Sequence, residues 1–339
     1  MMAVETKKLN IIQAINEGLS EAMAADDKVI VFGEDVADRE GGGVVGVTHG
    51  LSTRFGDERV RSTPISEQAI IGAAIGAAIN GYKPVAEIML MNFTTVAMDM
   101  IVNHAAKLRY MSGGQTGVPI TIRMMTGAGI SVAGQHSDFL EAWFAHTPGL
   151  KVVAPSSAAD AKGLMLSCID DPDPCIFIEC SRAYAMADDV PVGAQRIPLG
   201  KAKVVREGAD VTVVTYSEIV HRALKAAKAL EDEGLSVEVI DLRTIAPWDR
   251  DTVIESARKT GRVVVAHEAV RRFGVGAEIA ATLQEELFGE LKAPVMRVGA
   301  PFAPVPFSKP LEEAFLISAD QIADAIRSTT GAKTPVTTS

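Results

Sequence analysis

Glu67 stands where a loop meets a very apolar segment, and a carboxylate at such a boundary can support chemistry. The stretch STPISEQAIIGAAIGAAING favours a helix over about 67–80, with Ser66 as its N-cap. One explanation for Glu67 is structural, because the helix dipole stabilises a negative charge in the first turn. The other is functional: a desolvated carboxylate that shares a proton with a basic nitrogen of a ligand.

His136 lies in MMTGAGISVAGQHSDFLEAWF, between an expected strand and an expected helix that contains aromatic residues. Three glycines in this loop allow the backbone to approach a ligand or to adopt positive φ angles. The imidazole could simply cap the next helix. It could equally act as a general acid or base, since histidine titrates near neutral pH.

Two further positions follow expected strands. Phe93, in EIMLMNFTTVAMD, is either a core aromatic or faces a planar heterocycle. His267-Glu268 ends another strand and is a weaker catalytic candidate. The glycine-rich stretches REGGGVVG and FGVGAE match neither the dinucleotide fingerprint nor the P-loop. We therefore expect no phosphate-binding loop in this chain, so another chain would hold the phosphates of a phosphorylated cofactor.

The elements that position these residues alternate between strand and helix almost throughout the chain. Short apolar runs such as VIVFG and VTVVT are typical of buried parallel strands, and apolar residues three and four apart mark the helices between them. This alternation in both halves predicts an α/β protein with two doubly wound domains and mostly parallel sheets. Ligands lie at the carboxyl ends of such strands, which singles out Glu34 and the loops after Ile88 and Met125.

The domain boundaries follow from composition. We expect the first domain over residues 8–185 and the second over 201–328. Residues 186–200 hold prolines and glycines with little periodicity, which indicates an interdomain linker. Residues 329–339 are polar and predict a disordered tail.

Composition and charge exclude several classes of protein. The chain has 339 residues and a net charge of −10 without a basic run, so we expect no binding to nucleic acid or to an anionic membrane. No apolar stretch approaches the length of a membrane span, and the start lacks the apolar core of a signal peptide. The three cysteines match no zinc pattern and are expected to be reduced thiols of a cytoplasmic protein.

Several segments together resemble one family. They are RVRSTPISEQ, AEIMLMNF, AAKLRYMSGGQ, AGQHSD, HTPGLKVVAPSSAADAKGL, VIDLRTIAPWD and VVVAHEAVRRFGVGAEI. Each resembles the β subunit of thiamine-diphosphate-dependent 2-oxo acid dehydrogenases, the first, decarboxylating component of the pyruvate, branched-chain 2-oxo acid and acetoin dehydrogenase complexes. The resemblance extends over about residues 8–328 and implies a thiamine-diphosphate pyrimidine-binding domain followed by a transketolase C-terminal-like domain.

The resemblance also implies partners. The family assembles as a heterotetramer of two α and two β chains, in which the α chain binds Mg2+ and the cofactor diphosphate through a G-D-G…N motif. This sequence contains no G-D-G, since Gly56-Asp57 is followed by Glu58. We therefore expect a β chain that needs an α subunit, a second β chain and a lipoyl-bearing acyltransferase component.

Site residues carry over from the family one by one. Glu67 matches the glutamate that hydrogen-bonds the aminopyrimidine ring of thiamine diphosphate and so promotes formation of the ylide. Phe93 matches the aromatic residue that packs on the pyrimidine, and Ile65 and Glu34 match positions that line the cofactor pocket. His136 matches the active-site histidine that assists proton transfer during reductive acylation of the lipoyl group.

A monovalent cation site, possible for K+, is implied at Ile120, Cys168, Asp171 and Asp173. The run Asp170-Asp171-Pro172-Asp173-Pro174 is a rigid, oxygen-rich turn of a kind that suits a hard cation. The alternative is a simple surface turn. Both explanations fit the residues.

The resemblance favours pyruvate or acetoin as substrate, with REGGGVVGVTHGL similar to acetoin-type and some pyruvate-type β chains. The enzyme would cleave a carbon–carbon bond and pass the acyl unit to a lipoyl domain. The alternatives are a branched-chain 2-oxo acid dehydrogenase β subunit, a non-catalytic docking subunit of such a complex, and a nicotinamide-dependent oxidoreductase. The missing dinucleotide fingerprint disfavours the last of these.

Overall fold

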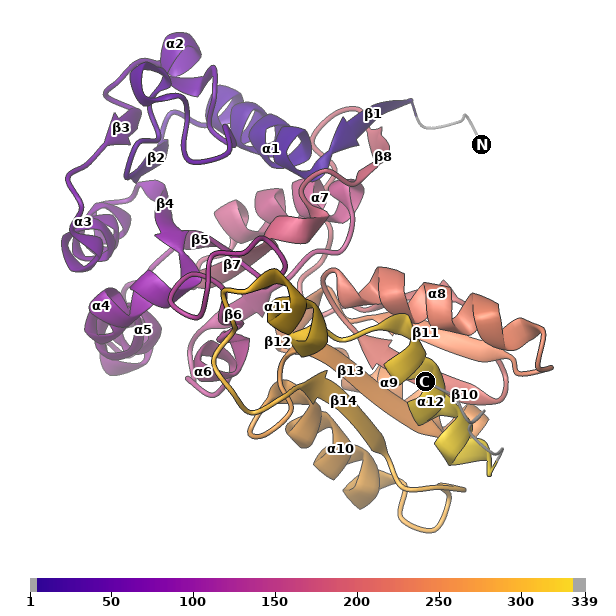
Figure 1. Ribbon diagram of the computed structural model, residues 1–339. Coiled ribbons are helices and arrows are strands. Elements are labelled where there is room, and N and C mark those ends of the chain that lie inside the picture. The colour runs from indigo at the N-terminus through magenta and orange to yellow at the C-terminus, as the bar shows by residue number, and fades with distance from the viewer. Residues whose placement is uncertain (1–4, 332–339) are drawn as a thin grey trace.

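The larger of two main sheets contains the strands expected to carry the site. The computed structural model describes residues 5–331 and divides them between two α/β domains (Figure 1). The larger sheet has the order β12-β6-β7-β5-β4-β2-β3. Its strands are β2 (Val29–Gly33), β3 (Val60–Ser62), β4 (Lys83–Leu90), β5 (Thr121–Thr126), β6 (Lys151–Val153), β7 (Cys175–Cys180) and β12 (Thr244–Ala246). All of the pairings are parallel except that of β12 with β6.

Helices cover both faces of this sheet. α1 (Ile11–Ala25) and α7 (Ala158–Asp170) pack together in the same apolar cluster as β2 and β7. α3 (Glu67–Ile79), α4 (Thr94–Asp99), a π-helical turn (Met100–Ala105) and α5 (Ala106–Met111) lie on the other face. The short helices α2 (Leu51–Phe55) and α6 (Glu141–Ala145) complete the domain.

The second domain repeats this layered plan around five strands in the order β14-β13-β10-β11-β9. They are β9 (Lys203–Arg206), β10 (Val211–Thr215), β11 (Val237–Asp241), β13 (Val263–Val270) and β14 (Met296–Ala300). α8 (Ile219–Glu231) and α12 (Ala319–Thr330) pack together in one apolar cluster, while α9 (Arg250–Thr260) and α10 (Val275–Glu286) belong to another. α11 (Lys309–Phe315) lies beside the first domain (Figure 1).

Local sequence explains several of these elements. All five residues of β10 are buried and all five are valine or threonine, which is typical of a strand covered on both faces. Asn10 begins α1 with a capping box in which Asn10 and Gln13 each accept the other's backbone N–H. Asp249 caps α9 by accepting from Thr252 N–H, and Gly261 ends that helix with φ of 70°.

Two segments differ from the expected boundaries. Part of the expected linker 186–200 forms β8 (Ala187–Pro191), which pairs antiparallel with β1 (Thr6–Asn10). α12 runs on to Thr330, beyond the expected limit at 328, because Thr329 is buried against its domain. The remainder of the expected disordered tail, residues 332–339, lies outside the described residues. In residues 5–331, no helix has both the length and the apolar character needed to cross a membrane.

The two domains share one core. The largest apolar cluster includes Ile122 and Phe139 of the first domain together with Val214 and Ile240 of the second. A buried polar contact crosses the same boundary, where Tyr216 Oη donates to Glu141 Oε1 at 2.7 Å. Burial raises the pKa of Glu141 to about 7.

Arg123 is a buried cation at the centre of the larger sheet. It lies on β5 and bonds Glu179 of β7 in bidentate fashion, at 2.8 Å for both contacts, and it also pairs with Glu87 of β4. Tyr184 Oη donates to Glu179 at 2.7 Å. The guanidinium therefore ties three neighbouring strands together while neutralising two carboxylates that burial would otherwise disfavour.

Replacing Arg123 tests this tie. Arg123→Met should lower the free energy of unfolding by about 3–5 kcal/mol, because it leaves Glu87 and Glu179 buried without a cation. Urea unfolding of the full chain measures the loss. Arg258→Met is the matched control, since it breaks a half-exposed pair with Glu290 and should cost at most about 1 kcal/mol. Equal losses for the two variants would contradict the role given to Arg123.

The raised pKa of Glu141 predicts a pH dependence of stability. Between its unfolded pKa of 4.5 and its folded pKa of about 7, only the folded protein keeps the proton on Glu141. Stability should therefore fall as pH rises through this window, and Glu141→Gln should remove on the order of 2 kcal/mol of that fall. Urea unfolding at pH 5 and pH 7.5 measures it. Exposed Glu255→Gln is the control, and a wild-type slope in Glu141→Gln would refute the assignment.

Candidate active site

Four of the candidate residues follow four adjacent strands. Glu34 comes directly after β2, Glu67 begins α3 after β3, Phe93 ends the turn after β4, and His136 lies in the loop after β5. The strands β5-β4-β2-β3 are neighbours and parallel, so their carboxyl ends meet at one edge. The chain leaves β2 for β3 on one side and returns to β4 on the other. This is a topological switch point, where open α/β sheets bind ligands.

Two buried carboxyl groups lie near each other at this edge. Glu34 and Glu67 are 5% and 8% exposed. Burial raises the pKa of Glu34, and the negative charges of Glu67 and Asp35 raise it further. Glu34 Oε1 has no hydrogen-bond partner within the chain. Glu34 therefore takes up a proton more readily than an exposed carboxyl, and its Oε1 is open to a ligand.

Glu67 occupies the first position of α3, as expected. Ser66 precedes it as the N-cap residue, although its hydroxyl makes no capping hydrogen bond. Ile65, two residues before Glu67, is 82% exposed. This chain alone therefore encloses no pocket around Ile65.

Phe93 and His136 are brought into contact. Their ring centroids are 5.4 Å apart and the rings meet edge to face at 75°. His136 is half-buried, and its Nδ1 is a buried atom without a hydrogen-bond partner, as is Ser137 Oγ. A buried nitrogen without a partner is costly in a folded protein, so Nδ1 is available to a ligand.

Asn92 holds the His136 loop on the end of β4, and sequence reasoning missed it. Its Nδ2 donates to Gly134 O at 3.0 Å and to Asp138 Oδ2 at 2.8 Å, while its Oδ1 accepts from Asp138 N at 3.2 Å. Thr126 Oγ1 donates to Asp138 O at 2.6 Å. The only signal in the sequence was an amide beside Phe93 and a carboxylate two residues after His136, and nothing linked the two.

His267 belongs to the core and not to this edge. It is fully buried, it stacks on Tyr216 at 6.2 Å, and burial lowers its pKa to about 4. The glycines of FGVGAE leave room for the His267 ring, because a Cβ at Gly274 or Gly276 would come within 2.8 Å of it. The glycine pattern is therefore explained by packing.

The expected cation site is already rich in hydrogen bonds. Ile120 O accepts from Cys175 N at 2.9 Å, and Cys168 O accepts from Asp171 N at 3.3 Å. Lys151 Nζ lies 2.5 Å from Asp171 Oδ1, and Arg109 Nε lies 2.5 Å from Asp173 Oδ1. These side-chain carboxylates are neutralised within the chain, so a cation would have to use the second lone pairs of the carbonyl oxygens. Across residues 5–331, no group of three His, Cys, Asp or Glu side chains is placed to hold a metal ion.

An apolar groove lies beside the domain boundary, and none of the four site residues lines it. Its volume is about 1070 Å³, and its lining includes Trp143, Trp248, Phe273 and Phe302. Trp143, Phe273 and Phe302 are at least half exposed. Such a concentration of exposed aromatic surface is typical of an interface with another protein chain.

Two family models account for most of the chain. "Transketolase, pyrimidine binding domain" matches residues 7–186, and "Transketolase, C-terminal domain" matches residues 200–322. Among solved structures, "Split gene transketolase, inactive beta4 tetramer" has a TM-score of 0.78 at 25% identity, covering 96% of this chain and 99% of that chain. Transketolase from Leishmania mexicana has a TM-score of 0.72 at 18% identity, covering 97% of this chain and 46% of that chain.

Curated relatives are more similar in sequence. The β subunit of acetoin:2,6-dichlorophenolindophenol oxidoreductase from Cupriavidus necator is 48% identical, with coverage of 95% of this chain and 98% of that protein. The pyruvate dehydrogenase E1 component β subunit of Rickettsia felis is 46% identical, with coverage of 94% and 98%. The mitochondrial 2-oxoisovalerate dehydrogenase β subunit of Chaetomium thermophilum is 48% identical, with coverage of 89% and 65%. The chain therefore belongs to the transketolase-like family of E1 β subunits of pyruvate and acetoin dehydrogenase complexes.

Proposed function

We propose that this chain is the β subunit of a thiamine-diphosphate-dependent dehydrogenase that acts on pyruvate or acetoin with an α subunit. The observation that carries the proposal is the placement of Glu34, Glu67, Phe93 and His136 after four adjacent parallel strands. This edge belongs to the domain that the pyrimidine-binding family model matches. The high identity to acetoin and pyruvate dehydrogenase β subunits supports the same function.

The residues at this edge fit the pyrimidine end of thiamine diphosphate. Glu34 Oε1 and His136 Nδ1 are buried polar atoms that lack partners within the chain, as expected where a ligand completes the hydrogen bonds. Phe93 offers an aromatic face, and Glu67 a buried carboxyl at a helix N-terminus. Bound thiamine diphosphate supplies the carbon nucleophile and the electron sink for cleavage of a bond next to a carbonyl.

Each residue of the chain has a distinct task in this proposal. Glu67 exchanges a proton with a ring nitrogen of the aminopyrimidine, which requires a carboxyl shielded from water. Glu34, whose pKa burial raises, offers its unpartnered Oε1 for a hydrogen bond beside Glu67. Phe93 orients the ring and the imidazole together. His136 transfers protons on the substrate side, near the incoming lipoyl group.

An α subunit is needed because this chain leaves the site incomplete. The sequence has no phosphate-binding motif, and Ile65 at the edge of the site is 82% exposed. Helix α3 presents exposed Ala69 and Ala73, and a Cβ at Gly76 would meet no atom within 4 Å. A partner chain packed there would bring the residues that hold Mg2+ and the diphosphate.

We propose the further assembly on the same basis. Two α and two β chains would form the active unit, with the aromatic groove around Trp143 and Phe273 covered by a second β chain. A lipoyl-bearing acyltransferase would accept the acyl unit. K+ at the carbonyls of Ile120 and Cys168 stays a prediction. The three buried free cysteines suit a reducing compartment such as the cytoplasm.

The branched-chain alternative rests on one observation, the 48% identity to the 2-oxoisovalerate dehydrogenase β subunit. Its shared length is smaller, at 307 residues against 331 for the acetoin relative. A non-catalytic docking role would leave the unpartnered buried atoms of Glu34 and His136 without a purpose. Pyruvate or acetoin is therefore the substrate we propose.

The substrate assignment can be tested by co-expressing the chain with a neighbouring α-type gene. The complex should reduce an artificial electron acceptor with pyruvate or with acetoin, and it should depend on thiamine diphosphate and Mg2+. Either chain alone should be inactive, because the site is split. Preference for 3-methyl-2-oxobutanoate would support the branched-chain alternative. An intact complex that turns over none of the three substrates would contradict the proposed function.

Glu67→Gln should lower turnover of the α–β enzyme by on the order of 100-fold or more, because an amide cannot exchange the proton. The amide keeps the shape of the carboxyl, so the unfolding midpoint in urea should stay close to that of the wild type. Glu58→Gln, in an exposed position before β3, is the matched control and should retain full turnover. Normal turnover of Glu67→Gln would remove Glu67 from the proposed role.

A further inference from the structure

The His136 loop has a backbone conformation that two of its residues, Ser131 and Ala133, do not favour. Gly127 and Gly129 have φ angles of 111° and 109°, and the non-glycine residues Ser131 and Ala133 have φ angles of 58° and 64°. Side-chain-bearing residues rarely adopt such angles, and they persist only where surrounding contacts over-determine them. The contacts that hold this loop therefore decide where His136 points.

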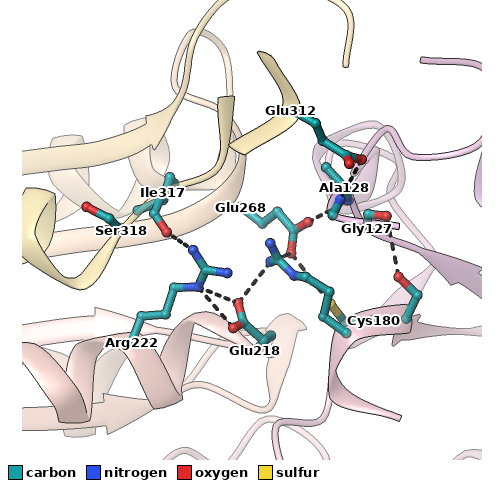
Figure 2. A network of polar contacts seen from close by, with 12 residues as sticks. Gly127, Ala128, Cys180, Glu218, Arg222, Glu268, Glu312, Ile317 and Ser318 are labelled. Atoms are coloured by element: carbon teal, nitrogen blue, oxygen red, sulfur yellow. Dashed lines mark hydrogen bonds and ion pairs between the residues drawn. The ribbon is translucent and has the colours of Figure 1, made fainter. Parts of the chain in front are cut away.

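Glu312 of the second domain supplies the most concentrated of these contacts. Its Oε1 accepts from Gly129 N at 2.7 Å, and its Oε2 accepts from Ser131 N at 3.0 Å and from Ser131 Oγ at 3.2 Å. Figure 2 shows the carboxylate of Glu312 facing the segment at Gly127 and Ala128. One carboxylate thus binds two backbone N–H groups on either side of residue 130, in the manner of an anion in a backbone nest.

The position of Glu312 is itself well supported. It lies on α11 and is 2% exposed. Phe315, one turn further along α11, packs in a small apolar cluster with Ala128, Ala300 and Val305. Among residues 5–331, no Lys, Arg or His side chain lies within ion-pair distance of Glu312. Within the described residues, the side-chain hydrogen bonds of Glu312 are those to Gly129 and Ser131.

A second carboxylate of the same domain supports the start of the loop. Glu268 accepts from Ala128 N at 3.0 Å, and Arg182 Nη2 lies 2.9 Å from Glu268 and 2.9 Å from Glu218 (Figure 2). Arg222 bonds Glu218 in turn and donates to Ile317 O. This network anchors Glu268, whereas Glu312 bonds the loop residues nearer to His136.

Residues 131–133, which Glu312 helps to hold, connect directly to His136. The backbone N–H of His136 donates to Ala133 O at 3.2 Å, so the imidazole follows the geometry of residues 131–133. A Cβ on Gly134 would lie 3.3 Å from Pro304, which shows that the second domain also packs closely here. The loop is thus placed between Asn92 of its own domain and Glu312 of the other.

We propose that Glu312 is a positioning residue, whose carboxylate holds loop 127–134 in the conformation that presents His136 to the active site. The inference rests on the proposed function only for the catalytic role of His136. The hydrogen bonds of Glu312 to Gly129 and Ser131, called the clamp below, are a property of this chain. The second domain would then contribute directly to catalysis in the first, from α11 and without touching the substrate.

Hydrogen–deuterium exchange of the α–β complex tests the clamp without reference to activity. In Glu312→Gln, an uncharged isostere, the amides of residues 128–136 should exchange on the order of tenfold faster than in the wild type. Glu313→Gln, an exposed neighbour on α11, is the matched control and should leave these amides unchanged. Equal exchange in the two variants would overturn the proposal. If Glu312→Gln fails to assemble, Ser131→Ala removes one contact and should give a smaller increase in the same peptide.

Kinetics then test whether the clamp acts through His136. Glu312→Gln should lower kcat on the order of tenfold with little change in the KM for thiamine diphosphate. It should cause no further loss in a His136→Ala background, because the two changes then affect one step. An equal further loss there would overturn the link to His136. Faster exchange together with normal turnover of His136→Ala would support the clamp and count against the proposed function alone.

Discussion

Because β2, β3, β4 and β5 run parallel side by side, every segment that leaves one of them emerges at the same edge of the sheet. This single constraint gathers four residues from widely separated parts of the chain. The sheet is held against slippage by Arg123, which bonds carboxylates on two neighbouring strands within the core. The candidate site thus depends on strand alignment, and the alignment depends in part on a buried charge whose partners neutralise it.

The second domain contacts both the sheet and the His136 loop of the first domain. Strand β12, which follows β11 in the chain, pairs with β6 of the first domain, and one apolar cluster continues across the boundary. Carboxylates of Glu268 and Glu312 bind the backbone of the His136 loop. A loop with positive φ angles at Ser131 and Ala133 needs such external support. The two domains are therefore one functional unit.

The main strands and helices could be predicted from local pattern, since apolar runs and helical spacing reflect burial of one face. The sequence predicts an irregular linker over 186–200, whereas the structure has the strand β8 there. Local pattern does not reveal β8, because it is short and polar and pairs with β1 near the other end of the chain. The strand-end position of His267 predicts a weaker catalytic candidate, but the structure buries this residue in the core, where its pKa falls to about 4. Its place at a strand end did not reveal what would cover it.

The sequence by itself determined the alternating α/β plan, the family, and the positions of Glu67 and His136 next to a helix start and a glycine-rich loop. These depend on residues close together in the chain. Only the tertiary structure decided that Glu34 and Glu67 are close enough to influence each other, that Phe93 contacts His136, and that Asn92 and Glu312 hold the loop. Such contacts join residues 33 to 183 positions apart, and no local pattern encodes a distance across the fold.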